Sequence, residues 1–473
     1  SDYASEGDDQ VNYQEFIAGK FAAAMPTGFD GPFDLPESLF PMQHDLVSWS
    51  LKRGRAAIFA DTGLGKSRMQ VSWAAKVHEL TGLSVMILAP LAVAQQTIAE
   101  GAEIGVTITR CREPGDVKPG LNITNYDRIH KFDCSQFGAV VLDESSCIKH
   151  HTAKTLQTLM DSFGHCLYKL CATATPAPND WTELGTHAEF LGICSRAEML
   201  AEFFVHDGGE TQTWRLKGHA RHLFWQWVAS WGAMIRKPSD LGYDDAMYAL
   251  PPLTVVDHVV DTDEDKIADN GMLFALEAST MSERREAKKA SLANRVQQCA
   301  DIVNSSADTW VVWCELNAEA DALKAAIPDA VEIRGPDDAD LKERRLMEFA
   351  QGNTRVLITK ASITGWGLNW QHCHNTAFVG VSDSFEAYYQ AIRRFWRFGQ
   401  KKEVTVHRFA SQLESAVMKN LERKQAISID MGESLAMETR AAVTAQIKGA
   451  TRATNDYNAI QKVKAPAWLV SEE

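Results

Sequence analysis

The stretch ADTGLGKS at residues 60–67 constrains the fold of this chain more than any other feature of its sequence. It follows the apolar run AAIF and precedes the helical pattern RMQVSWAAKVHEL, which is the strand–loop–helix context of a phosphate-binding loop, or Walker A motif. Glycines let backbone N–H groups turn inward around phosphate oxygens, and the positive end of the new helix adds to the attraction. The usual first glycine of this pattern is Ala60 here, so a chance loop of similar composition is the alternative.

The spacing within this loop predicts a role for each polar side chain. Lys66 would reach the β and γ phosphates of a nucleotide, and Ser67 would hold Mg²⁺. The predicted nucleotide-binding set also contains Thr62, Gly63 and Gly65. The loop therefore predicts ATP and Mg²⁺ as cofactors.

A second apolar run, AVVLDESS at 139–146, ends in two adjacent carboxylates. Burying carboxylates is costly unless they have a task, so paired acids at the end of a buried strand suggest chemistry. Asp143 would hold Mg²⁺, directly or through water, and Glu144 would orient and activate the attacking water. The alternative is a strand that simply meets solvent with polar residues.

Short apolar runs alternate with helical or polar stretches along most of the chain. Buried strands that alternate with helices indicate βαβ units and a parallel sheet. One series of runs occupies 56–60, 84–90, 121–126, 139–144 and 168–176; another occupies 254–260, 309–315, 355–360, 375–381 and 404–409. The two series predict two α/β domains in tandem.

The segment between the two series is helical in pattern and rich in Trp. Its side chains fit a small helical core packed on the first domain, or an element that braces the protein against a nucleic-acid duplex. The predicted organisation is a lead-in at 1–35, a first domain at 36–194, the Trp-rich insertion at 195–253, a second domain at 254–432 and a C-terminal tail at 433–473.

Composition limits the class of protein and its surroundings. The net charge of −14 argues against a nucleic-acid binder, although a basic run at 393–402 leaves room for a basic groove on an acidic body. The sequence contains no apolar run of about 18 residues, so it predicts no membrane span. The nine scattered Cys and the polar N-terminus predict reduced thiols and a cytoplasmic location. The HCH triplet at 372–374 lacks a second ligand cluster at zinc-site spacing.

Further segments narrow the choice among phosphate-loop proteins: FPMQHDLVSWSLKRG, ILAPLAVAQQ, ITNYDRI, CATATPAPN, ITKASITGWGLNWQ and QAIRRFWRFGQ. Together with the phosphate loop and the DEAH-like box VLDESSCIKH, they resemble superfamily 2 helicases and translocases, most closely the Swi/Snf-type branch. The resemblance runs from about residue 38 to 412, and small phage-encoded members with a DESS box are especially similar. Ser145 and Ser146 replace the usual Ala-His, and Trp396 stands where His is usual.

The resemblance implies two RecA-like domains with ATP in the cleft between them. Arg394 and Arg397 then match the family's arginine fingers, and Gln390 helps to place the γ phosphate or its water. Gln43 matches the glutamine that reads adenine. Arg393 fits a finger less well, because the family's spacing falls on Arg394.

The same spacing predicts a helix through this motif. Gln390, Arg394 and Arg397 stand at i, i+4 and i+7, which is one face of a helix. An ordinary amphipathic helix with a basic face is the alternative. The apolar side chains expected to face elsewhere, into the sheet, are Phe395, Trp396 and Phe398.

The resemblance also places nucleic acid across both domains, with contacts mainly to backbone phosphates. The candidate contacts are Thr124, Asn125, Thr173, Thr364, Gly365 and Trp366. Trp366 would stack on a base or pack its own loop. The predicted function is an ATP-dependent translocase or helicase on duplex or branched DNA, without sequence preference. The alternatives are an RNA helicase, a scaffold that does not hydrolyse ATP, and a metabolic phosphate-loop kinase.

Overall fold

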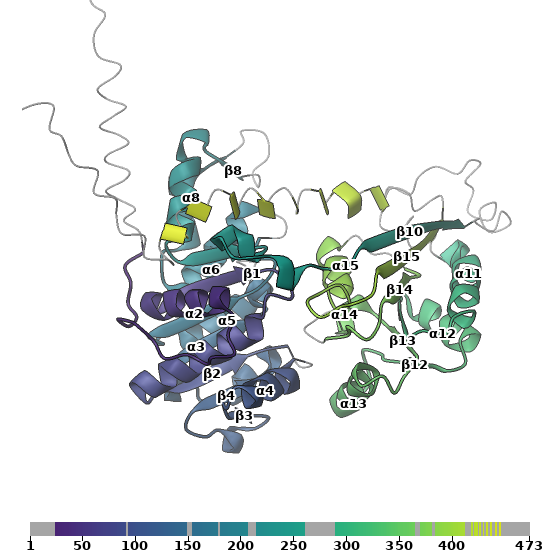
Figure 1. The fold of residues 1–473 in the computed structure, drawn as a ribbon, viewed down its shortest axis with the longest axis horizontal. Helices are drawn as coiled ribbons and strands as arrows, with labels where there is room; N and C mark the ends of the chain where they lie inside the picture. The colour runs from purple at the N-terminus through teal and green to yellow at the C-terminus, as the bar shows by residue number, and fades with distance from the viewer. Residues whose placement is uncertain are drawn as a thin grey trace, which may run out of the picture.

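The computed structural model describes residues 24–90, 93–148, 154–177, 180–206, 214–260, 289–364, 369–380 and 384–411, with scattered positions between 418 and 445. The chain forms two α/β domains that lie side by side, each built around its own sheet (Figure 1). All neighbouring strands in both sheets are parallel. This architecture agrees with the prediction of two tandem RecA-like domains with parallel sheets.

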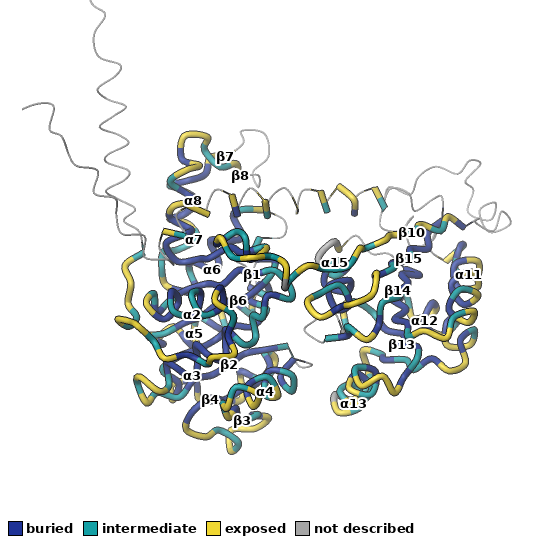
Figure 2. Tube along the Cα trace, viewed as in Figure 1, coloured by how far each residue is buried: buried dark blue, intermediate teal, exposed yellow. Residues whose placement is uncertain are grey.

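The sheet of the first domain has seven strands in the order β3-β4-β2-β5-β6-β1-β9. Their bounds are Arg55–Ala60 (β1), Ser84–Leu88 (β2), Ile108–Arg110 (β3), Leu121–Thr124 (β4), Phe137–Asp143 (β5), Tyr168–Ala172 (β6) and Gly232–Ile235 (β9). The middle strands are buried on both faces, as parallel strands covered by helices must be (Figure 2). In β1, Ala56 and Ile58 join the core on one face, whereas Ala57 and Phe59 join the core on the other.

Helices cover both faces of this sheet. One face is covered by α2 (Pro41–Arg53), α3 (Lys66–Thr81) and α4 (Ala94–Glu103). The other is covered by α5 (Lys154–Phe163), α6 (Leu184–Leu191), α7 (Arg196–Phe203) and α8 (Arg221–Ala229). The 13-residue α2 starts at a proline and is followed by Gly54, whose φ of 72° is easily adopted only without a side chain.

The Trp-rich segment is less helical and less separate than its sequence predicts. Besides α7 and α8 it contains a hairpin of β7 (Phe204–His206) and β8 (Trp214–Leu216), and then β9, which pairs in parallel with β1. Trp225 and Trp231 are fully buried in the core of the first domain. The segment therefore completes the first sheet and its core, in agreement with the packed-core interpretation.

The second domain has six strands in the order β10-β15-β14-β11-β13-β12. Their bounds are Leu253–Val260 (β10), Trp310–Trp313 (β11), Ala330–Glu332 (β12), Val356–Thr359 (β13), Asn375–Phe378 (β14) and Val404–Ser411 (β15). One face carries α11 (Leu292–Asn304) and α12 (Asn317–Ala326); the other carries α13 (Ala339–Ala350) and α15 (Phe385–Ile392), with the short α14 (Ala361–Thr364) next to α15.

The chain after β15 returns to the first domain (Figure 1). The Arg236 side chain donates to the Ile429 carbonyl (3.3 Å) and pairs with Glu433 (3.3 Å), and Ala436 is buried in the core of the first domain. The predicted boundary between residues 432 and 433 therefore falls inside a segment that already contacts the first domain.

All nine Cys are free thiols, in agreement with the prediction. In the HCH triplet, Cys373 donates its thiol hydrogen to the Thr309 carbonyl (3.2 Å). The described residues contain no group of three His, Cys, Asp or Glu side chains that could hold a metal ion.

Among the helices that the structure describes, none combines the length and the hydropathy needed to cross a bilayer.

Candidate active site

The phosphate loop turns tightly between β1 and α3 because two glycines adopt conformations that other residues avoid. Gly63 has φ 91° and Gly65, the residue before α3, has φ 81°. The Gln43 side chain lies so close to Gly65 that an added Cβ would clash with its amide nitrogen. Gln43 donates to the Leu64 carbonyl (2.9 Å) and accepts from the Phe40 N–H (3.0 Å). In this structure Gln43 therefore supports the loop, and its role in reading adenine stays a prediction.

The acidic box lies at the carboxyl end of β5, next to the loop. Glu144 has φ 53°, and among the described residues it is the only one other than glycine with a positive φ. Asp143 is 5% exposed, and its Oδ1 accepts from Gln70 (2.7 Å) and from the Glu144 N–H (3.1 Å). The Thr173 hydroxyl donates to Glu144 Oε2 (3.3 Å). Both carboxylates are thus held in place by neighbours from other elements.

Burial shifts the pKa of the charged groups in this cavity. Burial and the neighbouring Glu144 raise the pKa of Asp143 to about 7, against the opposing effects of Gln70 and Lys66. Burial lowers the pKa of Lys66, and the charges of Glu144, Asp61 and Asp143 offset part of this shift. A cation at Asp143 and an anion at Lys66 would each favour the charged form of its partner.

The side chains present fit a magnesium ion that is bound mostly by its substrate. Among the residues that the structure describes, Asp143 accepts its hydrogen bonds at Oδ1, which leaves Oδ2 for a cation. Ser67 lines the same cavity. Mg²⁺ is usually bound by one or two protein oxygens together with water and substrate phosphates, so it needs no cage of three acidic ligands.

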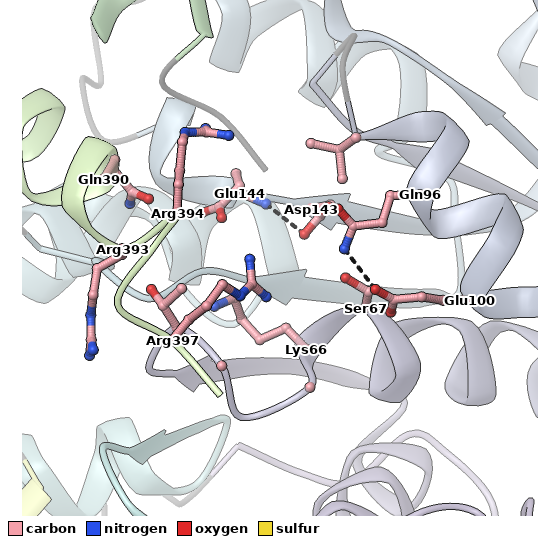
Figure 3. Close-up of a pocket in the computed structure, with 14 residues that line it drawn as sticks. Lys66, Ser67, Gln96, Glu100, Asp143, Glu144, Gln390, Arg393, Arg394 and Arg397 are labelled. Atoms are coloured by element: carbon pink, nitrogen blue, oxygen red, sulfur yellow. Dashed lines mark hydrogen bonds between the residues drawn. The ribbon is translucent and has the colours of Figure 1, made fainter. Parts of the chain in front are cut away.

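The second domain contributes to the same cavity through the chain at and after α15. Gln390, Arg394 and Arg397 line it together with Lys66 and Glu144 (Figure 3). The predicted continuous helix through these residues is wrong, because α15 ends at Ile392 and the chain continues in turns. The structure nevertheless brings the three side chains to one site.

Contacts distant in sequence explain why the helix stops. The Trp396 indole donates to the Pro251 carbonyl (2.6 Å), in the chain that links the domains. Phe398 is 37% exposed and packs against the rings of Phe40 and Tyr248. Its backbone N lies 2.8 Å from the position of a Cβ added to Gly63. Of the three aromatic side chains expected to face the sheet, only Phe395 is fully buried in the core.

Of the two predicted arginine fingers, Arg394 is buried and Arg397 is partly buried. Burial lowers the pKa of Arg394 to about 9 and that of Arg397 to about 10, with smaller effects from neighbouring charges. The Arg394 guanidinium lies 5.2 Å from the centroid of the Trp370 ring. Arg397 Nε and Gln390 Nε2 are buried and have no hydrogen-bond partner among the described residues. Buried donors of this kind favour an anionic ligand with several acceptors.

Arg393, which fits a finger less well by its spacing, lines the same cavity but has a partner of its own. Its side chain points away from Asp143 and Glu144 (Figure 3). It forms an ion pair with Asp61 of the phosphate loop and donates to the Tyr389 hydroxyl (3.0 Å).

The structure adds residues to this site that the sequence prediction omitted. On α4, Gln96 and Glu100 line the cavity and are hydrogen-bonded to each other (2.7 Å; Figure 3). On α3, Gln70 holds Asp143. The spacing of Gln96 and Glu100 at i and i+4 places two polar side chains on one helix face, and Gln70 follows Lys66 at the same spacing. These spacings are the signal that could have pointed to them.

The predicted nucleic-acid contacts are divided among several places. Thr124 and Asn125 lie at the end of β4 and line a second cavity between the domains. Thr173 is fully buried and bound to Glu144, so its assignment to the nucleic-acid surface is wrong in this structure. Thr364 is the last residue of α14. Gly365 and Trp366 lie outside the described residues.

Comparison with known proteins gives a weak structural likeness. No model of a protein family and no curated protein matches the chain. Among solved structures, it is similar to the Sulfolobus solfataricus SWI2/SNF2 ATPase core in complex with dsDNA, at 15% sequence identity and a TM-score of 0.41. The match covers 88% of this chain and 98% of the other. Identity and TM-score are both low, so this likeness carries no function to this protein.

Proposed function

We propose that the protein hydrolyses ATP between its two domains and uses the reaction to move on DNA. One observation carries this proposal: Lys66 of the first domain and Arg397 of the second line a single cavity. A nucleotide-binding site in this cavity would be complete only when both domains contact the nucleotide. The proposal extends to Mg²⁺ as the second cofactor.

The chain's own groups account for phosphoryl transfer to water. The phosphate loop would surround the phosphates with N–H groups, and Lys66 would bind the β and γ oxygens. Glu144 would orient and deprotonate the attacking water, and general-base catalysis typically contributes about 10²–10⁴ in rate. Arg394 and Arg397 would stabilise the γ phosphate as its charge redistributes, which is worth about 10³–10⁵ in rate for an arginine finger. Bound Mg²⁺ would neutralise charge on the phosphates, held by Ser67 and Asp143.

A site divided between two domains couples chemistry to motion. Nucleotide binding favours the closed arrangement, and loss of the γ phosphate removes the anion that holds the second domain's arginines in place. Repeated closure on a nucleic acid bound across both domains would move the protein along the backbone. Backbone contacts would give little sequence preference and a strong dependence on salt.

Two rival functions make different demands on the same residues. A scaffold that has lost hydrolysis would be expected to lack one of Lys66, Glu144 or Arg397, and the chain has all three. A metabolic kinase would not need arginines from a second domain of this kind. An RNA helicase would use the same ATP-site residues, and it would be distinguished by an ATPase rate that RNA stimulates and DNA does not.

The test is the steady-state ATPase rate with no nucleic acid, single-stranded DNA, duplex DNA, branched DNA and RNA, at low salt. We expect duplex or branched DNA to stimulate the rate. Stimulation by RNA alone would move the protein to the rival class, and no hydrolysis under any condition would contradict the proposal. Lys66→Ala should abolish the activity and weaken nucleotide binding, whereas Lys52→Ala, at an exposed position on α2, should do neither.

A further inference from the structure

The second cavity between the domains contains arginines of the first domain that face acids of the second. Arg110 ends β3, directly beside the end of β4, and Arg112 and Arg128 line the same cavity. The Arg128 side chain donates to the Arg112 carbonyl (3.1 Å), so the loops that carry these two residues are tied together. Asp340 and Glu343, both on α13, close the cavity from the other side.

Arg110 and Glu343 form the best-defined contact across this cavity. Arg110 Nη1 lies 2.9 Å from Glu343 Oε1, and Nη2 lies 3.0 Å from Oε2, so the pair is bidentate. The two side chains are 18% and 19% exposed. Arg112 adds a contact of 3.3 Å to Asp340 and one of 3.8 Å to Glu343. A guanidinium that binds a carboxylate in this way presents the same fork of donors that binds a phosphate.

Positively charged donors outnumber the acids in the same cavity. Three arginines of the first domain line it together with two carboxylates of the second, those of Asp340 and Glu343. This excess of guanidinium donors fits a cavity that also takes an anionic ligand, rather than one filled by α13 alone.

We propose that Arg110 and Arg112 bind backbone phosphates of DNA, and that Glu343 and Asp340 occupy these phosphate positions while no DNA is bound. The inference rests on the proposed function. DNA would replace the carboxylates, so its binding would release α13 from the first domain. The acids thereby lower the affinity for DNA, and the exchange couples DNA binding to the relative position of the two domains.

Replacing the acids and replacing the arginines should have opposite effects. Glu343→Gln, alone and with Asp340→Asn, removes the competing charge, and we expect the Kd for a short fluorescein-labelled DNA duplex to fall about three- to tenfold at low salt. Arg110→Gln should raise the Kd and reduce the slope of log Kd against log salt by about 0.9, the value for one lost phosphate contact. Asp340 is 72% exposed, so Asp340→Asn keeps the test available if Glu343→Gln impairs folding.

Glu348→Gln is the matched control, since it removes the same charge from the same helix at a residue outside this cavity. If the contact were only a brace between domains, Glu343→Gln and Arg110→Gln would shift the Kd in the same direction. That result would overturn the inference, as would equal Kd values for Glu343→Gln and Glu348→Gln. In either case, DNA binding by the wild type would still support the proposed function. Absence of DNA binding by the wild type and by the acid variants would overturn both.

Discussion

Asp61 and Arg393 form an ion pair that joins the phosphate loop of the first domain to the second domain. The Tyr389 hydroxyl donates to the same carboxylate (3.0 Å), and the Arg393 side chain is 7% exposed. Burial alone would raise the pKa of Asp61, but Arg393 and the Thr62 N–H outweigh it and lower that pKa. The loop that would hold the phosphates is therefore itself held by the domain that would supply the arginine fingers.

This pair predicts strongly non-additive effects of substitution. Asp61→Asn or Arg393→Gln alone leaves a buried group without its partner, whereas the double variant removes both charges. We expect the double variant to be less impaired than the sum of the two single variants by about 1–3 kcal/mol in kcat/KM for ATP. Additive effects across this double-mutant cycle would show that the two residues do not act together.

Glu144 is predicted to act on the attacking water rather than on nucleotide binding. Glu144→Gln should lower kcat by about 10² or more and leave ATP affinity within a few-fold of wild type. Single-turnover hydrolysis and fluorescent-nucleotide binding measure the two quantities separately. Normal turnover would mean that another residue is the base.

Thr173 should position Glu144 through the hydrogen bond to Oε2. Thr173→Val removes the donor and keeps the shape, so we expect a smaller loss of kcat than for Glu144→Gln, with no change in ATP affinity. In the Glu144→Gln background the second substitution should have little further effect. A full additional loss there would assign Thr173 a separate role.

Arg397 is predicted to contribute more to rate than to binding. Because an arginine finger acts on charge that develops in the transition state, Arg397→Ala should lower kcat by about 10³ or more and weaken ATP binding much less. Rapid-quench measurement of the hydrolysis step provides the comparison. An unchanged rate would exclude Arg397 as a finger.

His187 should make the stability of the first domain depend on pH. Its Nε2 lies 3.1 Å from the Ser145 hydroxyl, and burial lowers its pKa from 6.5 to about 4. Between these two pKa values the unfolded chain binds a proton at His187 that the folded chain does not. The contribution of His187 to the free energy of unfolding is therefore fully present above pH 6.5 and is lost as the pH decreases toward 4. The full effect is about 3 kcal/mol. The difference in urea unfolding between wild type and His187→Gln, followed from pH 7 to 4, should show it; a constant difference would contradict the assignment.

The sequence was sufficient for the strands that form continuous apolar runs between polar segments. All ten predicted runs contain a strand. For most of them the reason is that buried parallel strands need side chains that are apolar on both faces; the edge strand β10 is largely exposed. The three-residue strands β3, β7, β8 and β12 were missed, since each is too short to show a pattern. The parallel pairing of β9 with β1 depends on the folded first domain, so no local pattern predicts it.

The candidate site was predictable where chemistry is encoded locally. The loop at 60–67 and the acids at 143 and 144 each belong to one strand end, so spacing alone placed them. The end of α15 was not predictable, because it depends on the Trp396 contact with Pro251 in the linker. The ion pair of Asp61 with Arg393 spans more than three hundred residues of sequence and exists only once both domains have folded.

The absence of a side chain at Gly63 has a consequence for how variants of this protein should be interpreted. Since the backbone of Phe398 takes up the space that a methyl group would need, position 63 sets the minimum spacing between the two domains. We expect a larger residue there to act as a spacer: the open protein would still accept nucleotide, but the predicted arginine fingers would remain too distant. Turnover measured alone would attribute this defect to phosphate binding, whereas nucleotide affinity measured in parallel would separate the two.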